Sequence, residues 1–308
     1  MLTKSAFLVI IFSLLSVAAK AQDVVSAARV TLEGNGIPAA ETLLKQYRDA
    51  RGITPEYLEA YSWLGRKALS QKDYTAAEKY SHQTSDMVAA ELKHRALDAE
   101  EHLPIALGAA IEVHGLAMAA QGDRAGAIAY LQAEVKKYAT TSVAARIQKN
   151  INVISLEGKL APPLQETEHL GPRPQPLTAY HGKTVILFFW AHWCGDCKAE
   201  GPILARLKNE YGDRLALVGP TQRFGYAAAG NPAGPAEELR YIDDVRTKYY
   251  SRLSDMPVPV SAQNFRRYGA STTPTLVLIG ADGRVKLYHP GRMTYEELKA
   301  ALASAGLG

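Results

Sequence analysis

Cys194 and Cys197 are the residues of this sequence best suited to chemistry. They are the two cysteines that the chain of 308 residues contains. Thiolates are nucleophiles and metal ligands, so a C-x-x-C pair can exchange disulfides or supply half of a zinc site. A stabilising disulfide usually closes a long loop, because the entropy that it removes from the unfolded chain grows with loop length. A bridge across three residues removes little, so the spacing favours a chemical role.

A metal site is the alternative use of these thiols. Zinc or copper needs further ligands, and the sequence contains no second C-x-x-C and no H-x-x-x-H pattern. His192 lies two residues before Cys194, and we interpret it as an exposed loop histidine. The sequence therefore predicts neither a metal site nor a bound cofactor.

The segments around the cysteines predict a strand followed by a helix. Residues 184–190 form an apolar, β-rich run typical of a strand buried on both faces, and residues 194–211 have the pattern of a helix. Cys194 would then lie at a helix N-terminus, where unpaired N–H groups and the helix dipole lower the pKa of a thiol. We predict Cys194 as the nucleophile and Cys197, one turn later, as the less exposed resolving thiol.

The rest of the C-terminal half predicts a mixed sheet covered by helices. Further strands are expected at 215–219, 275–279 and 285–289, a loop at 222–235, and helices at 236–253 and from Thr294 to about Gly306. Asp282-Gly283 is a hairpin signal between the last two strands. Thr294 followed by Glu297 is a capping box.

The N-terminal half predicts helices only, and two of its stretches repeat at an offset of 50 residues. Gly65 and Gly115 occupy equivalent positions and allow close helix contact, while Asp73 and Asp123 can cap the helices that follow. This pattern resembles tetratricopeptide helical hairpins. The domain is either a docking site for a partner protein or a helical cap packed on the second domain.

Composition and targeting signals define the remaining organisation. A short apolar core followed by Ala19-Lys20-Ala21 predicts a cleaved signal peptide and hence a periplasmic or secreted protein, and the alternative is a membrane anchor formed by residues 5–19. A formal charge of only +4 argues against nucleic-acid binding. The predicted divisions are a signal peptide at 1–21, a helical domain at 22–158, a proline-rich linker at 159–180 and an α/β domain at 181–308.

The segment from Trp190 to Lys198, W-A-H-W-C-G-D-C-K, resembles the active site of the thioredoxin superfamily. Glu200 and Pro202 extend the likeness to the exported TlpA/ResA-type thiol-disulfide oxidoreductases, and Thr273-Pro274-Thr275 is similar to the cis-proline segment of that family. The resemblance implies a thioredoxin-like fold, protein disulfides or dithiols as substrates, and an electron donor in the membrane or periplasm.

The resemblance also implies roles for residues around the cysteines. Pro274, if cis, would hold the backbone of Thr273 beside the sulfurs, where an extended substrate could pair with it. Trp193 would line the substrate site. Trp190 is either a second wall of that site or a packed core residue.

Two departures from the family affect the mechanism. Phe188 stands where the family often has an acidic or amide residue that would assist proton transfer. Glu200, one turn after Cys197, is therefore our candidate for that role. The alternative is that Glu200 is a solvated carboxylate on the helix face. Asp196 between the cysteines should disfavour a thiolate and so favour a reductase. The alternatives are a disulfide oxidant or isomerase, and a partner-binding module on a thioredoxin-like scaffold.

Overall fold

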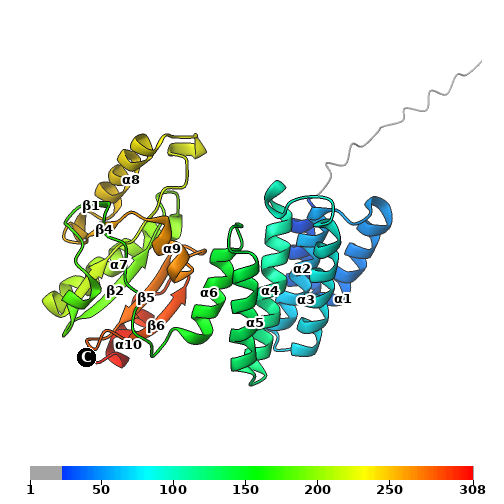
Figure 1. The fold of residues 1–308 in the computed structure, drawn as a ribbon, viewed down its shortest axis with the longest axis horizontal. Coiled ribbons are helices and arrows are strands. Elements are labelled where there is room, and N and C mark those ends of the chain that lie inside the picture. Colours follow the sequence, from blue (N-terminus) through cyan, green and yellow to red (C-terminus); the bar gives the residue numbers. More distant parts are fainter. Residues whose placement is uncertain (1–22, 308) are drawn as a thin grey trace, which may run out of the picture.

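The computed structural model describes residues 23–307, which form an all-helical domain followed by an α/β domain (Figure 1). The predicted signal peptide at 1–21 lies outside the described residues. Within the part that is described, α4 (His102–Ala120) is the one helix long and apolar enough to cross a membrane, and 56% of its most apolar stretch is buried inside the fold.

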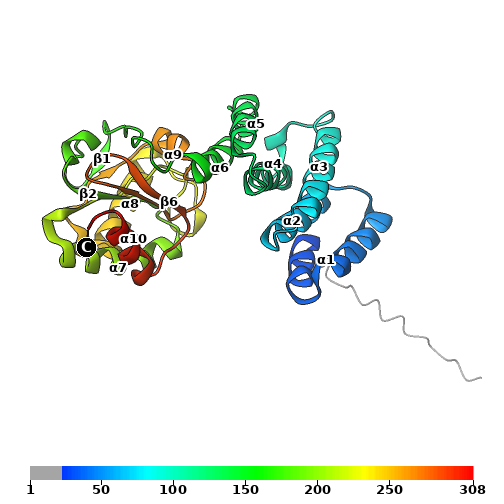
Figure 2. The same ribbon diagram turned by 90° about the horizontal axis from the view of Figure 1, so that it is seen from below.

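The helical domain consists of successive helices that pack against their neighbours along the chain (Figure 2). They are α1 (Val24–Arg51), α2 (Pro55–Ser70), α3 (Tyr74–Glu91), α4 (His102–Ala120), α5 (Arg124–Lys137) and α6 (Ala144–Ser155). Helix α1 is interrupted at Gly36, which has a φ of 79°. One core runs through all six and includes Leu58, Leu103 and Ile147.

The predicted caps and close contacts of the helical repeat are confirmed. The carboxylates of Asp73 and Asp123 accept hydrogen bonds from the backbone amides of residues 76 and 126, at 3.0 and 2.8 Å. A Cβ at Gly115 would lie 2.9 Å from Leu131, and one at Gly65 would lie 3.4 Å from Tyr80. Small residues at these positions therefore let α2 approach α3 and α4 approach α5.

The α/β domain is built on a four-stranded sheet in the order β3-β2-β5-β6. Its strands are β2 (Thr184–Phe189), β3 (Leu215–Val218), β5 (Thr275–Ile279) and β6 (Val285–Pro290). β2 runs parallel to β3 and antiparallel to β5, and β5 and β6 form the predicted hairpin. The expectation of a mixed sheet covered by helices is confirmed.

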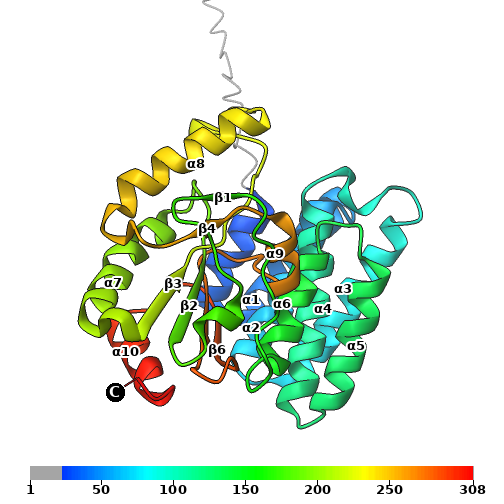
Figure 3. The ribbon, with the colours of Figure 1, turned by 60° about the vertical axis from the view of Figure 1, so that its left-hand side comes forward.

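Helices cover both faces of this sheet (Figure 3). Alternate residues of β2, beginning with Ile186 and Phe188, face a core shared with α7 (Gly195–Tyr211), α8 (Pro235–Tyr249) and α10 (Tyr295–Ser304). The intervening residues face a second core that contains Phe265 and Tyr268 of α9 (Ala262–Tyr268). β2 is therefore buried on both sides, as its apolar run predicts.

Several short elements were not anticipated from the sequence. Helix α9 and a two-stranded sheet of β1 (His169–Leu170) and β4 (Val258–Pro259) are too short to give a periodic signal. Short 3₁₀ turns lie at Leu97–Ala99, Leu177–Tyr180, Gly212–Arg214, Ala228–Gly230 and Ser251–Leu253.

The proline-rich segment 159–180 is fastened to the α/β domain along its length. Lys159 and Ala161 exchange backbone hydrogen bonds with the β5–β6 hairpin, at 2.9 and 3.0 Å. The backbone amide of Gln165 donates to Asn264 Oδ1 at 2.7 Å, and the backbone carbonyl oxygen of Glu168 accepts from the amide of Val260 at 2.8 Å. This segment therefore follows the surface of the α/β domain closely.

Helix α6 joins the two domains (Figure 1). Its Ile147 and Ile151 belong to the core of the helical domain, whereas Asn152 donates a hydrogen bond of 2.8 Å to the carbonyl oxygen of Tyr268 at the end of α9. Gly269 ends α9 in the left-handed region, with a φ of 59°, and a Cβ there would lie only 2.3 Å from the backbone nitrogen of Lys149. The helical domain is thus packed directly on the α/β domain.

We predict that Gly269→Ala lowers the free energy of unfolding by about 3 kcal/mol, because the left-handed backbone costs about 1–2 kcal/mol in alanine and the clash with α6 adds about 1–3 kcal/mol. Urea denaturation measures the change. The control is Gly182→Ala, where φ is 85° and nothing lies within 4 Å of the added Cβ. Equal losses in the two variants would contradict the close approach of α6 to Gly269.

Candidate functional site

Cys194 and Cys197 form a disulfide at the junction between β2 and α7. Cys194 is the N-cap residue of α7, and its Sγ accepts a hydrogen bond of 3.1 Å from the backbone amide of Cys197. Cys194 is 4% exposed and Cys197 is fully buried. An amide hydrogen bond and a helix N-terminus both favour negative charge on the Cys194 sulfur when the bridge is reduced.

The segment before β5 forms the opposite side of the site. The Thr273-Pro274 peptide bond is cis, as the resemblance implies. The Sγ atom of Cys194 lies 3.4 Å from the carbonyl oxygen of Thr273. The two segments that carry the site are 79 residues apart in the sequence, and the antiparallel pairing of β2 with β5 brings them together.

The two tryptophans of the motif have different environments. Trp190 is fully buried, and its Nε1 donates a hydrogen bond of 2.9 Å to the carbonyl oxygen of Gly219, so it is a packed core residue. Trp193 is 49% exposed beside the disulfide and packs edge-on against Phe224, with ring centroids 5.7 Å apart. Trp193 therefore presents an aromatic surface to solvent next to Cys194.

Glu200 lies inside the protein, which excludes the interpretation as a solvated carboxylate. Its side chain is fully buried, and neither carboxylate oxygen has a hydrogen-bond partner among residues 23–307. The nearest cation is Arg292, whose Nε lies 3.8 Å from Oε2. Burial raises the pKa of Glu200 to about 7. The backbone amide of Met293, which approaches the carboxylate without forming a full hydrogen bond, and the charge of Arg292 oppose the rise, while Asp196 adds to it.

Phe188 packs against Tyr250, and Tyr250 in turn lies close enough to Glu200 for its charge to act on the hydroxyl. Phe188 is fully buried and packs edge-on against Tyr250, at 5.6 Å between ring centroids. The Tyr250 hydroxyl is buried without a partner in the described part of the chain, and burial together with the charge of Glu200 raises its pKa. No sequence pattern points to Tyr250, because it follows a polar helix far from the C-x-x-C motif.

His192 is fully buried, so its interpretation as an exposed loop histidine is wrong. Its ring lies edge-on to three aromatic rings at 5.2 to 5.4 Å, those of Phe224, Tyr226 and Tyr241. Burial lowers the pKa of His192, and Glu238, whose Oε1 lies 3.3 Å from Nε2, opposes that shift. The neighbouring loop and α8, which the motif alone does not specify, cover this side chain.

Glu238 connects that loop to the redox motif. It is 1% exposed, and besides His192 it accepts hydrogen bonds from the backbone amides of Phe224 and Gly225, the latter at 2.9 Å. One buried carboxylate thus links α8, the 222–235 loop and the turn before Cys194. A glutamate in the first turns of a polar amphipathic helix resembles a solvated residue, so the sequence alone does not reveal this role.

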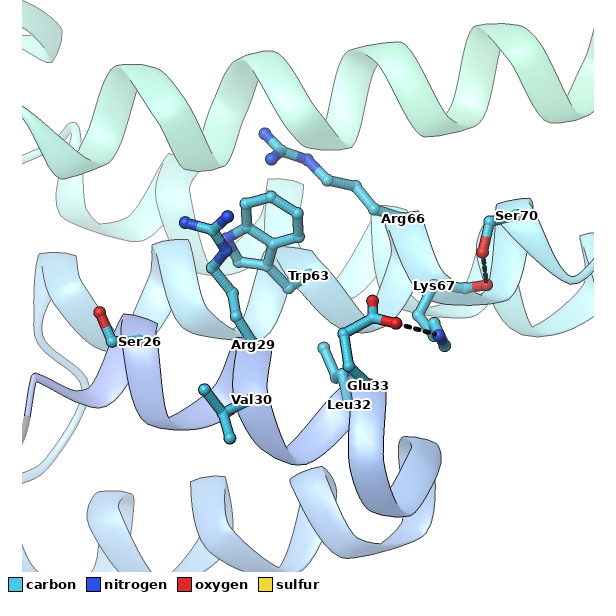
Figure 4. Close-up of a pocket in the computed structure, with 9 residues that line it drawn as sticks. All are labelled: Ser26, Arg29, Val30, Leu32, Glu33, Trp63, Arg66, Lys67 and Ser70. Carbon is cyan, nitrogen blue, oxygen red and sulfur yellow. Dashed lines mark hydrogen bonds and ion pairs between the residues drawn. The ribbon is translucent and has the colours of Figure 1, made fainter.

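A second candidate region lies on the helical domain, between α1 and α2 (Figure 4). The guanidinium carbons of Arg29 and Arg66 lie 4.6 and 4.3 Å from the centre of the Trp63 ring. The Nε1 of Trp63 and the Nε of Arg66 are buried and lack hydrogen-bond partners in the described structure. These groups line a cavity of about 660 Å³, and burial lowers the pKa of Arg66 to about 10.

Comparison with known proteins gives matches over the α/β domain. A family model described as a thioredoxin-like domain matches residues 177–306. The thiol-disulfide oxidoreductase ResA of Geobacillus thermodenitrificans is 31% identical over 136 residues, which cover 43% of this chain and 68% of ResA. The thioredoxin-like protein YneN of Bacillus subtilis is 28% identical over 146 residues, which cover 47% of this chain and 78% of YneN. Among solved structures, the exposed lipoprotein thioredoxin Etrx1 of Streptococcus pneumoniae is 26% identical in sequence. The match covers 42% of this chain and 90% of Etrx1, with a TM-score of 0.34.

We predict that the burial of Glu200 makes the oxidised protein less stable as pH rises. The folded carboxyl keeps its proton up to about pH 7 and the unfolded one up to about pH 4.5, so the folded state binds more protons in this window and the free energy of unfolding falls as pH rises through it. The difference between the folded and unfolded pKa values corresponds to a loss of about 3 kcal/mol in the free energy of unfolding across this window. Glu200→Gln should remove this part of the fall between pH 5 and pH 8, measured by urea denaturation.

The matched control for this measurement is Glu296→Gln, which changes an exposed carboxylate on α10. That variant should keep the wild-type pH dependence. If Glu200→Gln also kept it, the carboxyl of Glu200 would titrate alike in the folded and unfolded states.

Proposed function

Because this chain belongs, through its C-terminal half, to the thioredoxin-like thiol-disulfide oxidoreductases that include ResA, we propose that it reduces protein disulfides outside the cytoplasm. The Cys194–Cys197 bridge at the N-terminus of α7 is the observation that carries the proposal. The bridge is the oxidised form of the enzyme, so each turnover begins with its reduction by a dithiol donor.

The reaction transfers two electrons to the substrate. The Cys194 thiolate attacks one sulfur of a substrate disulfide, so that a mixed disulfide forms and the first substrate thiolate leaves and takes up a proton. The Cys197 thiolate then attacks the Cys194 sulfur and releases the second substrate thiol. The substrate is reduced to a dithiol, the enzyme returns to the disulfide, and a dithiol donor in the membrane or periplasm restores it.

Glu200 is proposed as the proton acceptor for Cys197. A buried thiol must lose a proton before it can attack, and the best general base has a pKa close to the working pH. The pKa of about 7 that burial gives Glu200 meets this requirement. Its position three residues after Cys197 puts both side chains on one side of α7.

Trp193, Thr273 and Pro274 are proposed to bind the substrate. The backbone of Thr273 lies beside Cys194, at 3.4 Å from carbonyl oxygen to sulfur, where an extended peptide can pair with it in a strand-like manner. The exposed ring of Trp193, the residue before Cys194, offers an apolar surface next to the disulfide. Both contacts suit a flexible segment of a protein substrate.

Asp196 supports the reducing direction. Its exposed carboxylate lies between the cysteines and disfavours a thiolate at either, which destabilises the reduced form and makes the couple a stronger reductant. Export is supported by the signal-like residues 1–21.

We predict that the Cys194–Cys197 couple has a reduction potential near that of thioredoxin, about −270 mV. The full mature chain is equilibrated with mixtures of reduced and oxidised dithiothreitol, and the fraction of disulfide is measured at each ratio. A potential near −120 mV, typical of a strong oxidant, would contradict the reductase.

Two cysteine variants distinguish an enzyme from a scaffold. Cys194→Ser should abolish the reduction of a protein disulfide, and Cys197→Ser should accumulate a mixed disulfide with the substrate, visible on a non-reducing gel. Unchanged turnover in Cys194→Ser would refute the role of this pair.

A second candidate function, recruitment of a partner by the helical domain, is favoured by the cavity between α1 and α2 (Figure 4). Arg29 and Arg66 line this cavity, and their guanidinium carbons lie 4.6 and 4.3 Å from the centre of the Trp63 ring. The adjacent guanidinium groups of Arg29 and Arg66 favour an anionic ligand, and arginine binds carboxylates in a bidentate manner. We propose that the cavity binds an acidic segment of a partner protein. Binding of a partner segment is also the docking role that the resemblance of this domain to tetratricopeptide hairpins implies.

We predict that a fluorescent hexaglutamate peptide binds the oxidised chain and that the double variant Arg29→Gln, Arg66→Gln binds it about tenfold or more weakly, since each lost charged hydrogen bond costs about 1.5–3 kcal/mol. Fluorescence anisotropy measures the affinity. The exposed Arg124 provides the control Arg124→Gln, which should bind as the wild type does. Equal binding by the double variant would remove this cavity as the acidic-peptide site.

A further inference from the structure

Helices α3 and α4 bring together two imidazoles and a carboxylate that play no part in the redox site. Glu78 and His82 are four residues apart on α3, so they lie on one face of the helix. His114 comes from the facing surface of α4. No H-x-x-x-H pattern marks this cluster in the sequence, because its ligands are shared between two helices.

The potential ligand atoms of these three residues all lie within 4.8 Å of one another. Glu78 Oε2 is hydrogen-bonded to His114 Nδ1, and it lies 3.4 Å from His82 Nε2. The two imidazole rings are 4.8 Å apart between centroids. Ligands of one tetrahedral ion are about 3–3.5 Å apart, given metal–nitrogen and metal–oxygen bonds of about 2.0–2.2 Å. A metal ion would therefore replace the hydrogen bond between Glu78 and His114 and separate these two donors slightly. A rotation of the exposed His82 side chain would bring the third donor to the same ion.

The surroundings of the cluster leave room for further ligands. A cavity of about 270 Å³ adjoins it, and Asp86 and Glu134 line this cavity together with Lys137. The ring of Tyr130 packs edge-on against His114, at 4.6 Å, and restricts how that imidazole can turn. A cation here would have one fixed imidazole, one adaptable imidazole, one carboxylate and access for water.

We propose that Glu78, His82 and His114 bind one divalent transition-metal ion, with zinc as the ion that the donor set fits best. Two histidines and one glutamate, with a fourth position for water, are a known ligand set of zinc. Imidazole nitrogen selects against magnesium and calcium, which prefer oxygen ligands.

The position of His82 separates this proposal from a simple ion pair between Glu78 and His114. The side chain of His82 is 64% exposed, whereas those of Glu78 and His114 are 24% and 21% exposed. An ion pair would hold α3 to α4 without His82. A metal site needs it as a ligand, so His82 gives a substitution that removes a ligand and spares the core.

The test is a calorimetric titration of the oxidised full mature chain, free of any histidine tag, with zinc chloride. Oxidation keeps Cys194 and Cys197 in their disulfide, so the thiols cannot bind the added metal. We expect one saturable site per chain and a melting temperature that rises with zinc. Cobalt(II) added in place of zinc should give visible absorption bands of a protein-bound ion.

Loss of a residue that only hydrogen-bonds to a metal ligand weakens metal binding roughly 10–100-fold. His82→Ala removes a ligand itself, so it should weaken zinc binding by at least that factor and abolish the zinc-dependent rise in melting temperature. Glu78→Gln should act in the same direction. His94→Ala changes another exposed histidine and should bind zinc as the wild type does. Zinc binding that is absent from the wild type, or equal in the wild type and His82→Ala, would overturn the proposal.

Discussion

Strand β2 is apolar on both of its faces, and the redox site depends on the packing that this allows. Its residues alternate between a core shared with α7, α8 and α10 and a core shared with α9, so the strand is fixed from both sides. The strand then turns directly into α7, and the N-cap of that helix is Cys194. Because the strand cannot shift in register without moving apolar side chains into the wrong core, the sulfur has a defined position against Thr273.

Burial determines the chemistry of the groups around the disulfide. Glu200 and Tyr250 are both buried without hydrogen-bond partners in the described chain, and both have raised pKa values. A carboxyl without such partners costs stability, and a protein can keep one where it is useful as an acid or base. Phe188, at a position where the family often has an acidic or amide residue, adds no charge to this region, and Glu200 is the buried carboxylate on α7.

The amount that the sequence could predict differs between the fold and the site. Long elements with clear periodicity were predictable, such as β2, α7 and α10, whose capping box is present. Helix α9 was not, since seven residues give no periodic signal. The motif identified the cysteines, but the burial of His192 depends on a loop and a helix that no local pattern connects to it. The metal-ligand cluster was missed for a related reason, because residues 32 positions apart meet only through the packing of α3 on α4.

Glu238 fixes both ends of a surface segment at once. It is bound to the backbone at Phe224 and Gly225, and it belongs to the first turns of α8. The chain between these points, residues 227–234, is therefore held at both ends by contacts of Glu238 that do not involve its own side chains. Insertions or substitutions there can change the outline of the surface beside Trp193 while the sulfurs stay in place.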